Sequence, residues 1–137
     1  MDKLTLYFDR NFGKRIPYAL SRMNPPMEIR WHDGERYPQN MPDDQWLEIA
    51  GKNNWIVLTQ DLKFHLIDHE IAAVRQHQVG CFYFPSSNYG IWKTTCAFIR
   101  FHQRVLALAS EVPRPFIFEF KGTGKLVTVL APANENR

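Results

Sequence analysis

Cysteine is scarce in this sequence, and long apolar runs are missing from it. Only two of the 137 residues are cysteines, Cys81 and Cys96, and no C-x-x-C pair occurs. A disulfide framework would need more cysteines, so the chain fits a reducing compartment. No apolar run approaches the roughly 20 residues that cross a bilayer, and the first residues lack the basic and apolar regions of a signal peptide. We therefore expect a cytoplasmic protein without a membrane segment.

Several motifs of common enzyme classes are also missing. Ser86 and Ser87 lack the G-x-S-x-G context of a nucleophilic serine. The glycines of residues 122–125 do not have the spacing of a P-loop, and no helical pattern follows them. His65 and His69 have an i,i+4 spacing that can bind zinc, but no cysteine or H-E-x-x-H context accompanies them. These absences weigh against a serine hydrolase, a P-loop nucleotidase and a zinc enzyme.

The composition is that of a well-packed folded chain. Hydrophobic residues make up 45% of it and aromatic residues 14%, which argues against disorder. A length of 137 residues fits one domain, so we expect residues 1–137 to form a single domain. The net charge of +3 and the pI near 9.0 indicate a polyanionic partner only weakly, because many small basic proteins bind no nucleic acid.

Apolar runs of strand type alternate with helical patterns along the chain. Residues 3–8 alternate little and are expected to form a central parallel strand that is buried on both faces. This order predicts an α/β fold with a largely parallel sheet, which ends in a C-terminal β-hairpin joined through residues 121–125. The expected strands are 3–8, 28–31, 55–60, 81–84, 116–120 and 126–130. The first expected helix has Pro17 in its first turn and ends at about residue 23, and the other expected helices are about 42–51, 67–78 and 89–110.

The last of these helices has a broad apolar stripe and a basic side. We expect the stripe to form core, although its breadth leaves room for a homodimer or partner surface. The basic side is either a solvated face or an extension of a nucleic-acid track. The stripe consists of Trp92, Thr95, Phe98, Ile99, His102, Val105, Leu106 and Ala109, and the basic side consists of Lys93, Arg100 and Arg104.

Three acids stand where ligand groups collect in such a sheet. Asp9 and Asp61 follow directly on the expected strands 3–8 and 55–60, and Asp43 opens a helix that follows a strand. The carboxyl ends of parallel strands and the starts of the next helices lie at one edge of the sheet. Structural roles remain open for each acid: Asp43 could cap its helix and Asp61 could form a turn.

For Asp9, the structural alternative is an ion pair with Arg10 or Arg15, because a partly buried carboxylate needs a partner. The functional interpretation is that the three carboxylates together hold Mg²⁺ or Mn²⁺, since hard cations select oxygen ligands. Such an ion can activate water for attack on a phosphodiester. Lys14, Arg15 and Lys63 are then candidate phosphate contacts.

At this point the sequence resembles the PIN-like domains, and within them the branch of VapC45-like toxins with the related Mut7-C and DUF5615 proteins. Three segments of the region 4–84 support the resemblance. They are Phe8-Asp9-Arg10; Pro42-Asp43-Asp44-Gln45-Trp46-Leu47, which is similar to a P-D-x-E-W-L helix start; and Thr59-Gln60-Asp61, followed by a helix that contains Glu70.

The resemblance implies a three-layer fold with helices on both faces of the sheet. It also implies a metal-dependent ribonuclease, often the toxin of a toxin–antitoxin pair, and hence RNA and an antitoxin protein as partners. Asp9, Asp43 and Asp61 would bind the metal, with Arg10 among the substrate contacts. Gln45 stands where the family has an acid, so Asp44 and Glu70 become candidates for an additional ligand.

Two competing functions remain from the sequence. The first is a PIN-like protein that has lost activity and serves in binding, which Gln45 favours. The second is a phospho-receiver domain, which also places acids at strand ends. A receiver needs an acidic pair after its first strand, whereas Asp9 is followed by Arg10.

Overall fold

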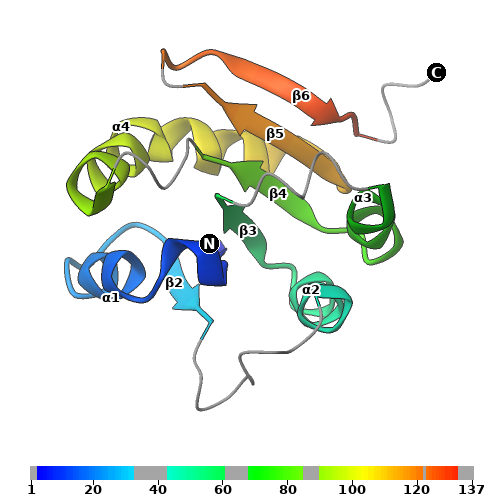
Figure 1. Ribbon diagram of the computed structural model, residues 1–137, viewed down its shortest axis with the longest axis horizontal. Coiled ribbons are helices and arrows are strands. Elements are labelled where there is room, and N and C mark those ends of the chain that lie inside the picture. The colour runs from blue at the N-terminus through cyan, green and yellow to red at the C-terminus, as the bar shows by residue number, and fades with distance from the viewer. Residues whose placement is uncertain (1–2, 33–42, 61–67, 85–89, 122, 133–137) are drawn as a thin grey trace.

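A computed structural model describes residues 3–32, 43–60, 68–84, 90–121 and 123–132 (Figure 1). Within these ranges, the side chains of Asp43, Asp44 and Glu70 are outside the description, although their backbone is helical. Asp61 and Lys63 lie outside the described residues altogether.

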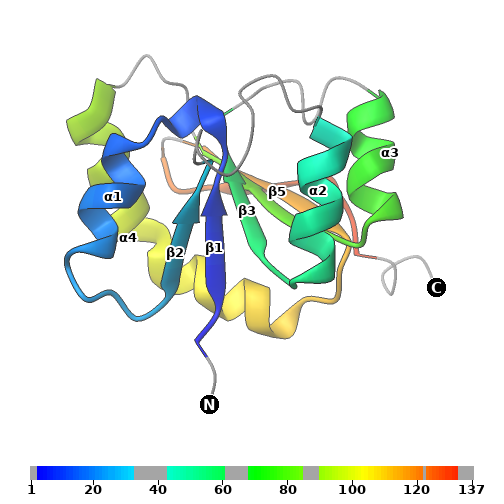
Figure 2. The same ribbon diagram turned by 90° about the horizontal axis from the view of Figure 1, so that it is seen from below.

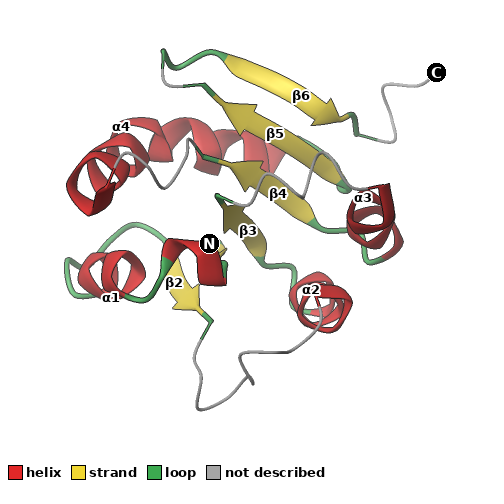
Figure 3. Ribbon diagram, in the orientation of Figure 1, coloured by secondary structure: helices red, strands yellow, loops and turns green. Residues whose placement is uncertain are grey.

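Six strands, four α-helices and one short 3-10 helix make up the described chain (Figure 3). The strands follow the apolar runs of the sequence, and a helix lies between most consecutive pairs of strands, as in a repeated βαβ arrangement. In chain order the elements are β1 (Thr5–Phe8), η1 (Arg10–Phe12), α1 (Arg15–Ser21), β2 (Glu28–Trp31), α2 (Asp43–Lys52), β3 (Ile56–Thr59), α3 (Asp68–Gln76), β4 (Gly80–Tyr83), α4 (Gly90–Glu111), β5 (Phe116–Phe120) and β6 (Leu126–Leu130).

The strands form one sheet in the order β2-β1-β3-β4-β5-β6. All neighbours from β2 to β5 pair in parallel, and only β6 runs antiparallel to β5, as the end of a C-terminal hairpin. β1 lies between β2 and β3, with Phe8 opposite both Trp31 and Leu58. The predicted largely parallel α/β sheet, its buried first strand and its final hairpin are therefore confirmed.

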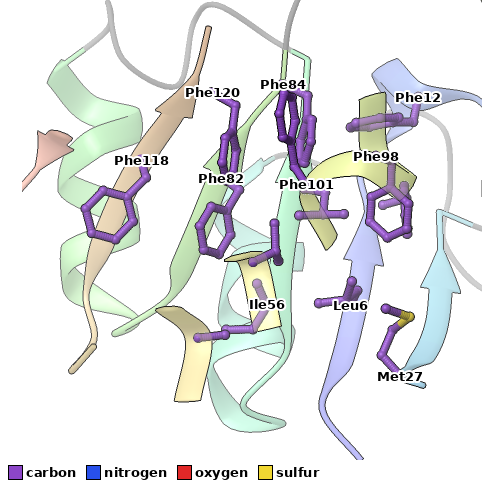
Figure 4. Packing of buried hydrophobic residues seen from close by; sticks show 14 of the residues in the cluster. Leu6, Phe12, Met27, Ile56, Phe82, Phe84, Phe98, Phe101, Phe118 and Phe120 are labelled. Atoms are coloured by element: carbon purple, nitrogen blue, oxygen red, sulfur yellow. The ribbon is translucent and has the colours of Figure 1, made fainter. Parts of the chain in front are cut away.

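Helices cover both faces of the sheet, which gives the three layers that the resemblance implies (Figure 2). α1 and α4 lie on one face, where Phe8, Phe82 and Phe84 point from the strands. Most of the large side chains of this layer are phenylalanines (Figure 4). We call this side the phenylalanine face.

α2 and α3 lie on the opposite face. The strand residues that point to it include Tyr7, Val57 and Cys81, and they pack against Trp46 and Leu47 of α2. Alternation along the strands explains the division, because successive side chains of a strand point to opposite faces. We call this side the mixed face, since aromatic, aliphatic and sulfur-containing side chains share it.

The buried side of α4 differs from the predicted one. Phe98, Val105 and Ala109 are buried as expected, but Trp92 is 79% exposed and Ile99 is 44% exposed. Thr94 and Phe101 take their place in the core. Apolar residues cover more than half of the circumference of α4, so the sequence pattern alone does not determine which side is buried. Packing against the sheet determines it. Among the described residues no helix is both long and apolar enough to cross a membrane.

Candidate active site

Asp9 is a buried carboxylate at the carboxyl end of the central strand β1. The strand ends at Phe8, and the side chain of Asp9 is only 4% exposed. Its backbone N–H donates to the carbonyl oxygen of Leu58 at 2.9 Å, so the pairing with β3 continues one residue past the strand. The prediction that Asp9 ends a buried strand is therefore confirmed, and its burial calls for hydrogen-bond partners.

Two donors orient the Asp9 carboxylate. The hydroxyl of Thr59 donates to Oδ2 at 2.9 Å, and the backbone N–H of Arg10 donates to Oδ1 as Asp9 caps the 3-10 helix η1. Thr59 is the last residue of β3 and is fully buried. These hydrogen bonds fix the orientation of a carboxylate, the type of group that hard cations select as a ligand.

The side chain of Asp9 belongs to the mixed face. Tyr7 precedes it by two residues and therefore shares its side of the strand. The Tyr7 ring stacks on Trp46 of α2 with ring centroids 5.6 Å apart, and on Trp55 with centroids 5.5 Å apart. Asp9 thus extends from the carboxyl edge of the sheet on the side that α2 and α3 cover.

The first turns of α2 and α3 lie at this same edge, because a helix between parallel strands runs antiparallel to them. Asp43 and Asp44 are the first two residues of α2, and Glu70 is the third residue of α3. A helix start carries a partial positive charge that favours carboxylates. A carboxylate at Asp43 would be favoured there whether or not it binds a metal ion. The site hypotheses for Asp61 and for the side chains of Asp43, Asp44 and Glu70 remain predictions.

Exposed cations flank Asp9 in the chain. Arg10, Lys14 and Arg15 are exposed and belong to η1 and the start of α1. Within the described part of the chain, Arg15 forms no ion pair, so it is not the structural partner of Asp9. Lys63, the fourth predicted substrate contact, lies outside the described residues.

The negative charge of Asp9 also affects the pKa of the Cys81 thiol in the core. Burial raises the pKa of the Cys81 thiol far above its ordinary value, and the negative charge of Asp9 raises it further, while Arg114 opposes the shift. Burial in turn lowers the pKa of Arg114. Cys81 is therefore a protonated, unreactive core residue at neutral pH.

Two residues near Asp9 were not predicted as part of the site. Thr59 contacts Asp9 from the neighbouring strand, a pairing of residues 50 positions apart. His32 follows β2 at the same edge, and its Nδ1 lies 3.3 Å from the hydroxyl of Tyr7. Thr59 had a recognisable place in the sequence, directly before Gln60-Asp61, but its partner depends on the register between β1 and β3.

The fit of a metal ion depends mainly on the acids whose side chains are not described. Among the side chains that the structure does describe, no group of three or more histidine, cysteine, aspartate or glutamate residues lies together. Asp9 fits a hard cation through its carboxylate chemistry and through the orientation that Thr59 and the start of η1 give it. The donor set as a whole is an oxygen set, which suits Mg²⁺ or Mn²⁺ better than zinc.

An apolar pocket of about 240 Å³ lies elsewhere, between the end of α1 and α4. Its lining includes Leu20, Met23, Phe98 and Ile99, and no carboxylate contributes to it. Such a lining suits neither a metal ion nor a phosphate. The candidate active site is therefore the edge of the sheet that contains the buried carboxylate of Asp9.

The fold and this edge define a class: a three-layer α/β domain with a buried carboxylate at the carboxyl end of its central parallel strand. The family model described as PIN-like domain matches residues 4–86, which is more than half of the chain. The chain therefore belongs to the PIN-like domain family, whose members are generally nucleases and typically use divalent metal ions. No curated protein and no solved structure matches it.

Proposed function

We propose that this protein is an endoribonuclease that depends on Mg²⁺ or Mn²⁺ and cleaves RNA phosphodiesters. Asp9, Asp43 and Asp61 are the proposed ligands, with Asp44 and Glu70 as candidates for an additional one. The observation that carries the proposal is Asp9 itself: a buried carboxylate in a PIN-like domain, fixed by Thr59 and by the start of η1 at the edge where α2 and α3 begin.

Each residue then has a defined role. Such an ion, when bound, supplies Lewis acidity toward a phosphodiester oxygen and activates a water for attack. Asp9 is held by Thr59 in one orientation, so little reorganisation is needed when the ion arrives. Arg10, Lys14, Arg15 and Lys63 are the proposed contacts to RNA phosphates, because exposed cations neutralise the backbone of a nucleic acid.

Replacing Asp9 by asparagine tests this function directly. Asp9→Asn keeps the size of the side chain but removes its charge. We expect the rate of Mn²⁺-dependent RNA cleavage to fall at least about a hundredfold, since an ion of this kind contributes several kcal/mol to the transition state. Isothermal calorimetry should show weaker Mn²⁺ binding as well.

The matched control is Glu48→Gln, which removes a carboxylate from α2 that is exposed and paired with Lys52. This control should cleave RNA and bind Mn²⁺ like the unaltered protein. Equal cleavage by Asp9→Asn and the unaltered protein would refute the catalytic assignment.

The alternative is a PIN-like protein that binds a partner without cleaving RNA. Gln45 favours it, because this exposed residue in the first turn of α2 carries an amide where the resemblance to the VapC45-like branch implies an acid. Calorimetry separates the two functions. Absence of Mn²⁺ binding at millimolar concentration would support the binding protein and count against the nuclease.

We further propose that the nuclease is the toxin of a type II toxin–antitoxin pair, in the VapC45-like branch, and that it acts in the cytoplasm. Its proposed partners are a cognate antitoxin protein and RNA, and a homodimer is the proposed assembly. A small helix-turn-helix protein in the adjacent reading frame would support the toxin, and unimpaired growth on expression of the protein alone would count against it.

A further inference from the structure

The segment that follows the family match is strongly basic. Residues 90–132 contain six lysines and arginines and two glutamates, a net charge of +4, whereas the whole chain has +3. The match to the PIN-like domain ends at residue 86. The excess positive charge of the protein therefore resides in α4 and in the connections before and after β5, a region that the family assignment leaves without a function.

Five cations of this segment come together along one flank of α4 and at the β5–β6 turn. Arg104 joins the two, because its Nη1 donates to the carbonyl oxygen of Gly124 at 2.6 Å and its guanidinium lies over the Phe120 ring at 5.2 Å. Within the turn, the backbone N–H of Lys121 donates to the carbonyl oxygen of Lys125 at 2.8 Å, which places the two lysines side by side. Lys93 and Arg100 continue the flank toward the start of the helix.

Most of this charge is not neutralised by the protein. All five cations are exposed, and Lys93, Arg100 and Lys125 form no ion pair within the described part of the chain. Lys121 pairs with Glu119 at 3.0 Å, and the other acid of the segment, Glu111, is the last residue of α4. An exposed array of unpaired cations attracts a polyanion.

An exposed tryptophan lies at one end of this array of five cations, next to Lys93. Trp92 is 79% exposed, which is unusual for so large an apolar side chain, and it directly precedes Lys93. Surfaces that bind single-stranded nucleic acid combine cations along the backbone with aromatic side chains on which bases stack. Trp92 with the five cations provides both components.

The array also begins at the edge that contains Asp9. α4 starts on the side toward which the parallel strands point (Figure 2), and the β5–β6 turn follows the carboxyl end of β5. β5 is three strands from β1 in the sheet order, which corresponds to about 14 Å at the usual spacing of strands. A single strand of a few nucleotides can span this distance.

We propose that Trp92, Lys93, Arg100, Arg104, Lys121 and Lys125 form a binding surface for single-stranded RNA that leads away from the candidate active site. The cations contact phosphates and Trp92 stacks on a base. The choice of RNA as the ligand rests on the proposed ribonuclease function. The surface itself rests on the contacts of α4 and the β5–β6 turn.

The test is the salt dependence of binding to a short, fluorescently labelled oligouridylate, measured in EDTA so that no cleavage occurs. The test variant is Lys93→Gln/Arg100→Gln/Lys125→Gln, which retains Arg104 because Arg104 holds the turn. Each lost phosphate contact reduces the steepness of the fall of log K, the association constant, with log salt by about 0.7. We therefore expect the slope to become less steep by about 2, and the affinity at low salt to fall on the order of a hundredfold.

A control variant removes the same amount of charge at the opposite edge. Lys3 precedes β1, Lys52 ends α2, and Arg75 lies in the last turn of α3. Lys3→Gln/Lys52→Gln/Arg75→Gln should leave the slope within about 0.7 of the unaltered protein. Equal losses in the two triple variants would show a response to net charge alone and overturn the proposal, as would an unchanged slope in the test variant.

Trp92→Ala supplies an independent readout. Loss of stacking should weaken binding by on the order of tenfold with an unchanged salt slope, because stacking on an aromatic ring involves no counterion release. Ile99→Ala, which removes an exposed apolar side chain without a ring, should not weaken binding. An unchanged affinity of Trp92→Ala would remove the stacking site from the proposal.

The binding tests of the RNA surface and the cleavage test of the proposed ribonuclease function can fail independently of each other. Circular dichroism of each variant establishes that it is folded. Failure of Asp9→Asn to lose cleavage would refute the catalytic site and leave the binding measurements in EDTA valid. If Lys93→Gln/Arg100→Gln/Lys125→Gln had the same salt slope as the unaltered protein, the RNA surface would be refuted. The cleavage result for Asp9→Asn would stay valid.

Discussion

The two faces of the sheet differ in what their buried side chains can do. On the phenylalanine face, strands and α4 contribute rings such as Phe82, Phe98 and Phe120, which have no polar atoms (Figure 4). On the mixed face, Tyr7 and Cys81 stand among the buried side chains, and Asp9 and Thr59 extend the same side to the carboxyl edge.

The difference indicates that the two faces of the sheet have different roles. A face made of hydrocarbon rings contributes burial and packing, about 3–5 kcal/mol for each large ring. A face with a buried carboxylate costs free energy, which its hydrogen bonds must offset. We infer that the phenylalanine face stabilises the fold and that the mixed face holds the chemistry.

Phe82→Ala should give the largest effect on stability and the smallest on the site. Phe82 is fully buried and contacts Phe116, Phe118 and Phe120 with ring centroids 5.4, 5.9 and 5.8 Å apart. We expect the free energy of unfolding to fall by about 3–5 kcal/mol in urea titrations. Mn²⁺ affinity measured at low temperature should stay unchanged, and a large change in it would argue against the division between the faces.

Thr59→Val should act mainly on the site. The substitution keeps the shape but removes the donor to Asp9 Oδ2, and a lost hydrogen bond to a charged group costs about 1.5–3 kcal/mol. We expect lower stability and altered Mn²⁺ affinity, measured by denaturation and calorimetry. Thr94→Val is the matched control, since Thr94 is buried in α4 on the phenylalanine face. A response of Mn²⁺ affinity to both variants would contradict a specific role for Thr59.

Gly51→Ala should disturb the packing between α2 and α3. A Cβ atom at Gly51 would lie 2.2 Å from the carbonyl oxygen of His77, a backbone atom that cannot rotate away. Alanine is better than glycine in a helix by about 1 kcal/mol, but overpacking costs about 1–3 kcal/mol or more. We therefore expect net destabilisation in thermal unfolding, although a propensity scale alone predicts the opposite sign.

Gly80→Ala provides the comparison on the other face, because its Cβ would lie 2.5 Å from the Phe116 ring. Both variants should unfold more easily, but only Gly51→Ala should also weaken Mn²⁺ binding, since it shifts the helices whose first turns lie at the same edge of the sheet as Asp9. Equal Mn²⁺ binding by the two variants would contradict this coupling.

The smallest predicted effect is on the stability of the fold at alkaline pH. Burial, assisted by Asp9, raises the pKa of Cys81 above its ordinary value of 9.0, so the folded protein retains a proton that the unfolded chain releases. The stabilisation is complete below pH 9.0 and is lost as pH rises above it, with a slope of up to about 1.4 kcal/mol per pH unit. Cys81→Ala should flatten this dependence, whereas Cys96→Ala, at an exposed thiol, should leave it unchanged.

Much of the fold follows from local sequence. The strands Phe116–Phe120 and Leu126–Leu130 have the predicted boundaries, because prolines precede the first and a glycine-containing turn separates the two. α1 spans Arg15–Ser21, so Pro17 is its third residue and lies in the first turn as predicted, while the helix ends two residues before the predicted end near Met23. Proline is tolerated throughout the first turn of a helix, where the N–H groups lack partners, so it does not mark one particular residue.

Less of the site can be predicted, because it depends on contacts between distant residues. The position of Asp9 at a strand end follows from the apolar run before it. Its hydrogen bond to Thr59 needs the register of β1 on β3, and the exposure of Trp92 needs the side of α4 that the sheet covers. Both are properties of the assembled layers, which a single apolar pattern does not specify.

The stack of Trp46, Tyr7 and Trp55 has a consequence for spectroscopy. The Tyr7 and Trp55 rings are nearly parallel, with an interplanar angle of 6°, and Trp46 lies on Tyr7 at 26°. Chromophores this close couple electronically and transfer excitation energy. Because the stack joins β1 to α2 two residues before Asp9, its near-ultraviolet dichroism is a native optical probe of the site, and it needs no attached label.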